Sequence, residues 1–270
     1  MFFIRLFLIG VLIGTGMIIP GVSGGVIAVI FGVYDKMIKS LYNLFKDFKK
    51  NFTFLFILFL GVIIGAIFFS RVLLFFYNKY EILTKFCFIG LILGGIPCLL
   101  KKVKEKTNKS INYFITLLFF TLSIIIFIVT KKMFTINLSN NLSFFNLFLS
   151  GVIYSVGKVL PGISSSLLLM IIGMYEFVLS LISNPFVYIF TNINLVLPFS
   201  LGLFFGIFIL LIIVNKLLDK HFRIIYSSII GFVLGQIPSL IPTYKLSINY
   251  IYGCVIMIFS LYLSYKISKK

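Results

Sequence analysis

The chain has 270 residues, of which 61% are hydrophobic and only 11% are charged, and its mean hydropathy is +1.18. Soluble domains carry about 25% charged residues, so a chain of this composition could not hide its apolar surface from water. The composition therefore excludes soluble proteins and predicts an integral membrane protein. The net charge of +18 is typical of lysines on loops beside anionic lipid, and we do not expect a nucleic acid partner.

The chain contains an internal repeat with an offset of 141 residues. The stretch LFLIGVLIGTGMIIPGVSGGVIAVIFGVYD begins at Leu6, and LFLSGVIYSVGKVLPGISSSLLLMIIGMYE begins at Leu147. All eight glycines between residues 147 and 238 align with a glycine of the first copy. Hydrophobic residues align by chance in an apolar chain, but glycines do not. We therefore expect one membrane domain made of two copies of one unit, residues 1–133 and 134–270.

Each copy begins with an apolar run that is interrupted by Pro-Gly and then continues only briefly. The continuations, 22–34 and 163–175, are shorter than the roughly 20 residues that a spanning helix needs. A helix broken inside the membrane is tolerated only within protein or beside a watery cavity. The pattern predicts a re-entrant or broken helical hairpin at 3–35 and another at 144–176.

Three longer apolar runs follow each hairpin and predict transmembrane helices. They cover residues 52–77, 86–100 and 111–130 in the first copy, and 190–214, 224–241 and 248–265 in the second. Two of the runs in each copy carry a G-x-x-x-G pair, which favours close helix packing and has no chemical role. These pairs are Gly61 and Gly65, Gly90 and Gly94, Gly202 and Gly206, and Gly231 and Gly235.

Lysines are distributed unequally between corresponding loops of the two copies. Residues 36–50 and 101–109 hold five lysines each, whereas the equivalent stretches of the second copy hold none and one. The positive-inside rule then places these two loops, residues 216–223 and both termini in the cytoplasm. Three crossings per copy would turn the second copy upside down relative to the first, in agreement with the charges. The expected fold is all-α, with two inverted-topology repeats in the cytoplasmic membrane.

The two Pro-Gly breaks are the candidate binding site. Inverted repeats with broken helices are typical of secondary transporters, whose substrate sites lie near the membrane midplane. Backbone N–H groups at a helix start, with glycines that let a ligand approach, favour an anion. The alternative is that serine caps the short helix and Pro-Gly makes a turn. The candidate residues are Pro20, Gly21, Ser23, Gly24 and Gly25 in the first break, and Pro161, Gly162, Ser164, Ser165 and Ser166 in the second.

Four charged residues within or beside the apolar runs are further candidates, because charge at membrane depth is expensive and usually functional. Lys158 and Arg71 are expected to assist in binding an anionic headgroup, unless they extend to the membrane interface. Asp35 and Glu176 occupy matching positions of the repeat. They are candidates for carrying a coupling proton or another ion, or for orienting a basic group. The alternative is that they mark helix boundaries at the interface.

We predict no cofactor, no metal site and no catalytic residue. The three cysteines lack C-x-x-C spacing, and the single histidine, His221, has no His or Cys partner. An intramembrane enzyme would need a nucleophile beside a base or a metal, and the sequence offers no such group. A purely structural protein would have no use for two broken, serine-containing hairpins.

The motifs IPGVSGGVIAVIFGVYD and LPGISSSLLLMIIGMYE resemble the paired signatures of the bacterial and archaeal polyprenyl-phosphate transporter family, and the similarity covers nearly the whole chain. The resemblance implies a flippase that returns undecaprenyl phosphate, the lipid carrier of cell-wall synthesis, from the outer to the inner leaflet. It also implies that residues 20–25 and 161–166 line the path, with Asp35 and Glu176 nearby. The chain departs from the family pattern at Val26, where Thr is common, and at Ser165, where Gly is usual.

The main alternative is an ion-coupled permease for a small anionic solute with the same architecture. The sequence leaves the coupling ion and the oligomeric state open.

Overall fold

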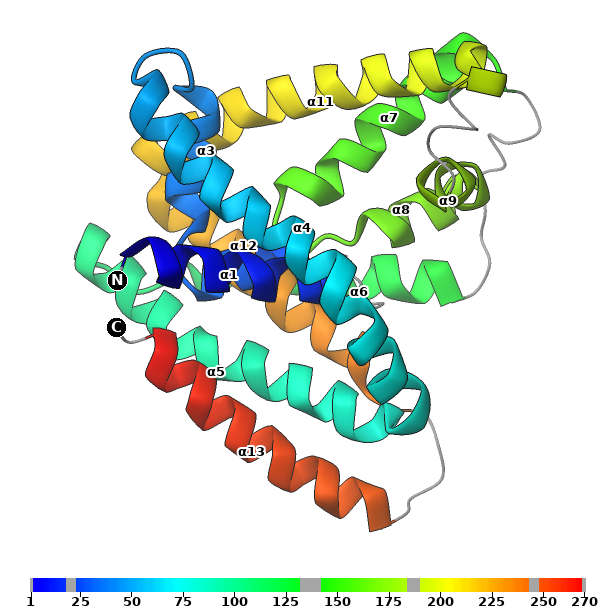
Figure 1. Cartoon of the computed structure of the whole chain (residues 1–270). Helices are drawn as coiled ribbons and strands as arrows, with labels where there is room; N and C mark the ends of the chain where they lie inside the picture. Colours follow the sequence, from blue (N-terminus) through cyan, green and yellow to red (C-terminus); the bar gives the residue numbers. More distant parts are fainter. Residues whose placement is uncertain (1, 18–22, 132–141, 184–189, 243–247, 269–270) are drawn as a thin grey trace.

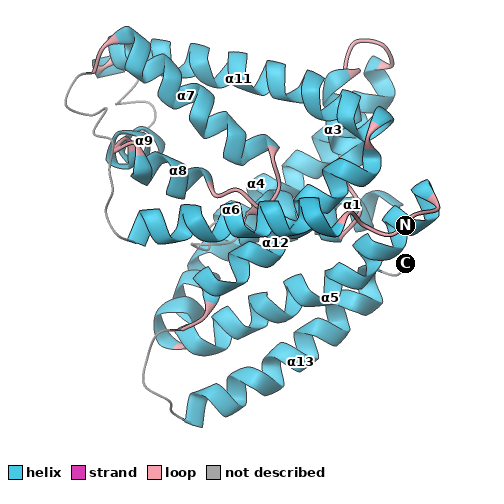
Figure 2. Ribbon diagram, turned by 180° about the vertical axis from the view of Figure 1, so that it is seen from behind, coloured by secondary structure: helices cyan, strands magenta, loops and turns pink. Residues whose placement is uncertain are grey.

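Helices form the secondary structure throughout the residues that the computed structural model describes, which are 2–17, 23–131, 142–183, 190–242 and 248–268 (Figure 2). Six of these helices are long and apolar enough to cross a membrane. This confirms the prediction of an all-α membrane protein. The first half consists of α1 (Phe2–Gly16), α2 (Gly24–Ile30), α3 (Tyr34–Tyr42), α4 (Phe48–Lys79), α5 (Glu81–Thr107) and α6 (Tyr113–Lys131).

The second half repeats the same helices in the same order. Helix α8 begins at the residue that matches the start of α2, and α9 at the residue that matches the start of α3. The repeat seen in the sequence therefore extends to helix boundaries. The helices are α7 (Phe144–Val159), α8 (Ser165–Ile171), α9 (Tyr175–Ser183), α11 (Ile193–Lys220), α12 (Phe222–Leu240) and α13 (Ile248–Ser268).

Several helices are longer than the apolar runs from which they were predicted. The loop expected at 78–85 is reduced to a junction at Tyr80, and His221 makes the corresponding junction between α11 and α12. The lysines expected in a loop at 101–109 lie mostly on the last turns of α5. The apolar run records only the part of a helix that faces lipid tails, whereas the backbone continues as helix among polar surroundings.

Helix α1 packs along α4, and its mate α7 packs along α11, with glycines at both contacts. A Cβ atom on Gly61 would lie 2.3 Å from the carbonyl oxygen of Phe7. A Cβ atom on Gly202 would lie 1.9 Å from the carbonyl oxygen of Phe148. The helices can approach this closely only without side chains at these positions, which confirms the packing role predicted for the G-x-x-x-G pairs.

The last helix of each half packs against the other half. Helix α5 pairs mainly with α13, and α12 pairs mainly with α6 (Figure 1). The second set of glycine pairs makes these contacts possible, because Cβ atoms on Gly90 and Gly231 would lie 2.3 Å from the Met257 oxygen and 2.4 Å from the Thr116 oxygen. The two halves are therefore interlocked.

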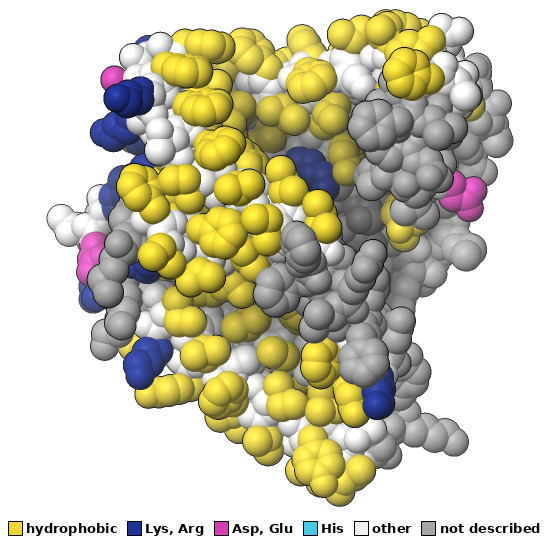
Figure 3. All heavy atoms as spheres, in the orientation of Figure 1, with side chains coloured by type: hydrophobic (Ala, Val, Ile, Leu, Met, Phe, Trp, Pro, Cys, Tyr) yellow, Lys and Arg dark blue, Asp and Glu magenta, His cyan; other side chains and the backbone are white. Residues whose placement is uncertain are grey.

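The surface of the protein suits a lipid environment. Hydrophobic side chains cover most of the face shown in Figure 3, and Lys and Arg side chains gather along its left edge. Both chain termini lie at that same edge in Figure 1. A hollow in the upper part of the apolar face exposes a further patch of Lys or Arg (Figure 3). The charged edge, which we call the basic end, is defined by Arg5, Lys36, Lys39, Lys102 and Lys106.

Candidate functional site

The short helices α2 and α8 begin directly after Ser23 and Ser164, the two serines that follow the breaks in the sequence. Ser23 and Ser164 have extended backbone conformations and occupy the N-cap positions. Neither side chain makes a capping hydrogen bond to its own helix. The capping alternative therefore does not describe this structure, and both hydroxyls can serve another purpose.

Each short helix is also ended by a glycine that the sequence repeat matched. Gly32 has a φ of +73° and Gly173 has a φ of +70°, a left-handed conformation that residues with a side chain rarely adopt. The chain turns at these glycines into α3 and α9. The continuations predicted at 22–34 and 163–175 therefore hold the short helices α2 and α8, and α3 and α9 begin at the last residues of these stretches.

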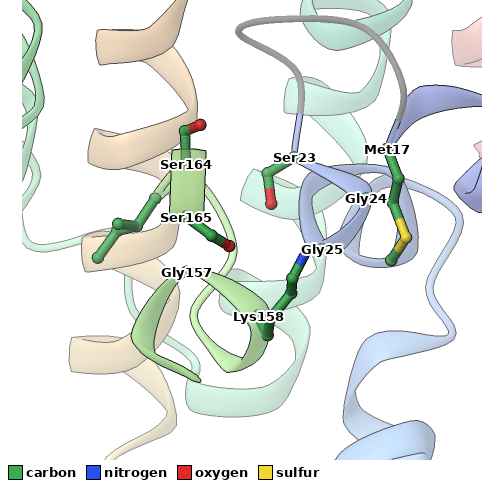
Figure 4. A pocket seen from close by; sticks show the side chains of 9 residues that line it. Met17, Ser23, Gly24, Gly25, Gly157, Lys158, Ser164 and Ser165 are labelled. Atoms are coloured by element: carbon green, nitrogen blue, oxygen red, sulfur yellow. The ribbon is translucent and has the colours of Figure 1, made fainter. Parts of the chain in front are cut away.

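The two breaks meet in one cavity of about 40 Å³, which we call the break cavity (Figure 4). Six of the residues that the sequence singled out line it, together with three that it did not. The lining residues are Met17, Ser23, Gly24 and Gly25 from the first half, and Gly157, Lys158, Ile163, Ser164 and Ser165 from the second.

Glycines bring the two halves close together around this cavity. A Cβ atom on Gly25 would lie 3.1 Å from the Cα atom of Pro161, across the boundary between the halves. A Cβ atom on Gly157 would lie 2.4 Å from the backbone nitrogen of Ser165. A larger residue at Gly25 would push the two halves apart, and a larger residue at Gly157 would push α7 away from the start of α8.

Polar groups converge on the break cavity. Figure 4 shows the hydroxyls of Ser23 and Ser165 and the ammonium of Lys158 directed toward the space between the halves. Lys158 is exposed, and its Nζ atom lies 4.7 Å from the centre of the Tyr154 ring, so the aromatic face also stabilises the cation. A cation beside hydroxyl donors and glycine backbone is suited to binding an anion without reacting with it.

The second break is held in place by a residue that the sequence reasoning missed. Gly162 has a φ of +89°, and its carbonyl oxygen accepts a hydrogen bond of 2.6 Å from Nε2 of the buried Gln236 on α12. The position that matches Gln236 in the first half is Gly95. The sequence did contain a signal for this role, because Gln236 is a polar residue within an apolar run and matches a glycine in the repeat.

Tyr34 ties the first hairpin to the second break. Its buried hydroxyl donates a 3.0 Å hydrogen bond to the carbonyl oxygen of Val159, the residue after Lys158. Burial, with a smaller contribution from the Asp35 carboxylate, raises the pKa of the Tyr34 phenol. A tyrosine phenol is protonated at physiological pH even without this shift, so it remains a donor.

Asp35 does not line the break cavity but belongs to a polar cluster at the basic end. One carboxylate oxygen accepts a 2.6 Å hydrogen bond from the Tyr226 hydroxyl, and the other lies 2.8 Å from the Lys102 ammonium. Lys102 also donates a 2.7 Å hydrogen bond to Tyr226. Glu176, at the matching position, is exposed, and among the residues described here it has no ion pair.

The remaining candidates are only partly covered by the structure. Pro20 and Gly21 lie outside the described residues, and Arg71 and Ser166 lie on α4 and α8 with side chains that are likewise not described. Within the described ranges, no group of three or more His, Cys, Asp or Glu side chains is placed to hold a metal ion.

Comparison with known proteins identifies the family. A family model described as undecaprenyl phosphate translocase-like matches residues 13–252. A polyprenyl-phosphate transporter of Staphylococcus aureus is 30% identical over 242 residues, which cover 86% of this chain and 84% of that protein. A polyprenyl-phosphate transporter of Vibrio cholerae is 27% identical over 254 residues, covering 89% of this chain and 78% of that protein. No solved structure matches the chain.

Both relatives are transporters and not enzymes, as the sequence predicted for this chain. The resemblance read from the two Pro-Gly motifs is likewise confirmed, since the matched region contains both motifs. The chain belongs to the undecaprenyl phosphate translocase-like family.

Proposed function

We propose that this protein transports polyprenyl phosphate across the cytoplasmic membrane and binds the phosphate group in the break cavity. The observation that carries the proposal is the convergence of Lys158 with Ser23, Ser164 and Ser165 in one cavity built by both halves. The lysine would pair with the phosphate charge, and the hydroxyls would donate to its oxygens. The names of the two relatives agree with this substrate.

A lipid substrate suits the surroundings of the cavity better than a sugar or an amino acid does. The phosphate needs a polar cavity inside the membrane, while the prenyl chain can remain among lipid tails. Of the described residues that line the break cavity, Lys158 alone carries a charge, and hydrophobic side chains cover most of the face of the protein shown in Figure 3. Helices α2 and α8 have only seven residues each, so their dipoles add little.

We further propose that the two halves have inverted topology and that the basic end faces the cytoplasm. Three spanning helices in each half and the exchange of α6 and α13 between halves support the first point. The gathering of lysines at the end that holds both termini supports the second. Transport toward this end would return the carrier lipid from the outer to the inner leaflet.

The position of Asp35 favours one of the roles predicted for it. A carboxylate already bonded to Lys102 and Tyr226 suits the orientation of a basic group better than the binding of a coupling ion. Arg71 and Glu176 stay predictions from the sequence.

Transport in vesicles tests the proposal. Vesicles containing the purified full chain would be loaded with labelled polyprenyl phosphate, and its exposure on each leaflet would be followed over time. Lys158→Met introduces the residue that matches Lys158 in the first half. It should reduce the rate by about 10- to 100-fold, because a charge-assisted hydrogen bond to phosphate is lost. Lys216→Met removes an exposed lysine of α11 and serves as the control.

Unchanged transport by a correctly folded Lys158→Met protein would contradict the assignment of the site. Uptake of inorganic phosphate by vesicles that contain no polyprenyl phosphate would instead support a permease for small anions.

A further inference from the structure

A second pocket lies at the basic end of the first half. It has a volume of about 190 Å³ and is formed by the start of α1, the turn between α2 and α3, and α4. We call it the basic pocket, and nothing in the function proposed so far uses it. Its lining residues are Arg5, Leu6, Ile9, Phe31, Gly32, Val33, Lys36 and Phe54.

The basic pocket combines an apolar wall with two cations. Leu6 and Phe54 of the wall are buried, whereas Arg5 and Lys36 are exposed. The Nζ atom of Lys36 lies 4.4 Å from the centre of the Phe54 ring, at the border between wall and cations. In the part of the chain that the structure describes, no ion pair joins Arg5 to an acidic residue. Such a site suits an amphiphile with an anionic head and an apolar chain.

The matching region of the second half lacks these two charges, and its described side chains pack together. Asn146 and Phe177 stand where the first half has Arg5 and Lys36. Met174, at the position of Val33, is fully buried, and the Phe177 ring lies 5.7 Å from the Phe199 ring in an edge-on contact. These side chains belong to a packed apolar cluster. The basic pocket is therefore a property of one end of the protein and does not follow from the shared fold.

The break cavity and the basic pocket lie at opposite ends of the same short helix. Ser23, Gly24 and Gly25 at the start of α2 line the first, and Phe31, Gly32 and Val33 after its end line the second. Seven helical residues span about 10 Å, which is roughly a third of the hydrocarbon thickness of a bilayer. The two sites are therefore close enough for one headgroup to occupy them in turn.

We propose that the basic pocket is a second binding site for the transported lipid phosphate, occupied when the headgroup reaches the basic end. Arg5 and Lys36 bind the phosphate, and the apolar wall holds the first part of the prenyl chain. This inference rests on the function proposed above. The second half has no charged residues at the positions that match Arg5 and Lys36. The transported lipid phosphate therefore finds this second site only at the basic end, which favours release there.

Photo-crosslinking of the full chain in vesicles tests this inference. A polyprenyl phosphate with a photoreactive group near the phosphate would be added, and the labelled peptides would be identified by mass spectrometry. The wild-type protein should be labelled both near Lys158 and in the peptides that contain Leu6 and Phe54. Arg5→Gln combined with Lys36→Gln should reduce labelling of the latter by about tenfold or more, because two charged contacts are lost, and leave labelling near Lys158 within about twofold.

Two further variants make the test specific. Lys49→Gln combined with Lys50→Gln removes two exposed lysines near the start of α4 that do not line the pocket, and should leave both labels unchanged. Lys36→Phe introduces the residue found at the matching position of the second half, Phe177. The phenyl ring should fill the basic pocket, so the variant should fold and show reduced labelling of the pocket.

The outcomes separate this inference from the proposed function. Labelling near Lys158 without labelling around Leu6 and Phe54 would overturn the second site and leave the transporter proposal intact. If the wild-type protein is labelled neither near Lys158 nor around Leu6 and Phe54, both the second site and the proposed function are overturned. Equal competition by phosphatidylglycerol would show a general site for anionic lipid, and equal competition by inorganic phosphate would show a site for the free anion. Either result would overturn a site for the transported lipid.

Discussion

The two hairpins end in the same backbone conformation, but the acidic side chains at these ends have different contacts. Helix α3 begins with Tyr34 and Asp35, and α9 begins with Tyr175 and Glu176. Asp35 is bonded to Tyr226 and Lys102, whereas Glu176 is exposed. The repeat therefore preserves where the chain turns, but not what the polar residues at the turn do.

The difference extends to helix packing. Helix α3 packs on α11, and Lys39 of α3 forms an ion pair with Asp219 of α11. No comparable packing joins their mates α9 and α4 in the described residues. One hairpin is tied to the opposite half at the basic end, and the other is not.

The largest effect should come from moving the cation of the break cavity from one half to the other. Lys158 and Met17 occupy matching positions and line the same cavity. Lys158→Met should weaken phosphate binding by about 10- to 100-fold, and adding Met17→Lys should recover part of the loss, because the ammonium again faces the same space. Binding of labelled polyprenyl phosphate to the purified variants measures both steps. No recovery in a folded double variant would show that the cavity distinguishes the halves.

A smaller effect is expected from neutralising the two matched acids in turn. Asp35→Asn leaves Lys102 without its carboxylate, and should lower the free energy of unfolding by about 1–3 kcal/mol, because both side chains are partly buried. Glu176→Gln should change it by less than about 0.5 kcal/mol, since that side chain is exposed. Thermal unfolding of the purified proteins gives the comparison. Equal shifts would mean that the Asp35 cluster adds no stability.

Removing the charges of both Asp35 and Lys102 should destabilise the protein less than removing the charge of Asp35 alone. Asp35→Asn combined with Lys102→Met leaves no unpaired ammonium, so the loss should be about 1 kcal/mol smaller than for Asp35→Asn alone. The same unfolding measurement checks this. Additive losses would show that the two side chains act independently.

The last comparison concerns a feature that the halves share, and we expect no difference between them. Gly32→Ala places a side chain at a φ of +73°, with no atom of the described residues within 4 Å of the new Cβ atom. Only backbone strain opposes the change, so we expect a loss of about 1 kcal/mol. Gly173→Ala at φ +70° should cost a similar amount. A much larger loss at one of the two positions would show that the turns are not equivalent.

Much of the fold and part of the site could be predicted from the sequence. Matched glycines reveal a repeat because their positions reflect backbone geometry, and apolar runs reveal spanning helices because lipid requires them. Six of the residues that line the break cavity were named for a similar reason, since a Pro-Gly break within an apolar run leaves few uses for a lysine and serines beside it. Of the cations of the basic pocket, Lys36 was recognised only as a loop charge and Arg5 was not singled out, because their role depends on the shape of the wall behind them.

Other features depend on which helices pack together. The packing of α6 on α12 and of α13 on α5 does not follow from a pattern along the chain, and neither does the hydrogen bond from Gln236 to Gly162. In each case the partners are far apart in sequence. The same holds for Asp35, whose partners Lys102 and Tyr226 come from α5 and α12. Periodicity shows which face of a helix avoids lipid or water, but many partners could cover that face. Only the tertiary packing selects one of them, and with it the charge that each buried polar group meets.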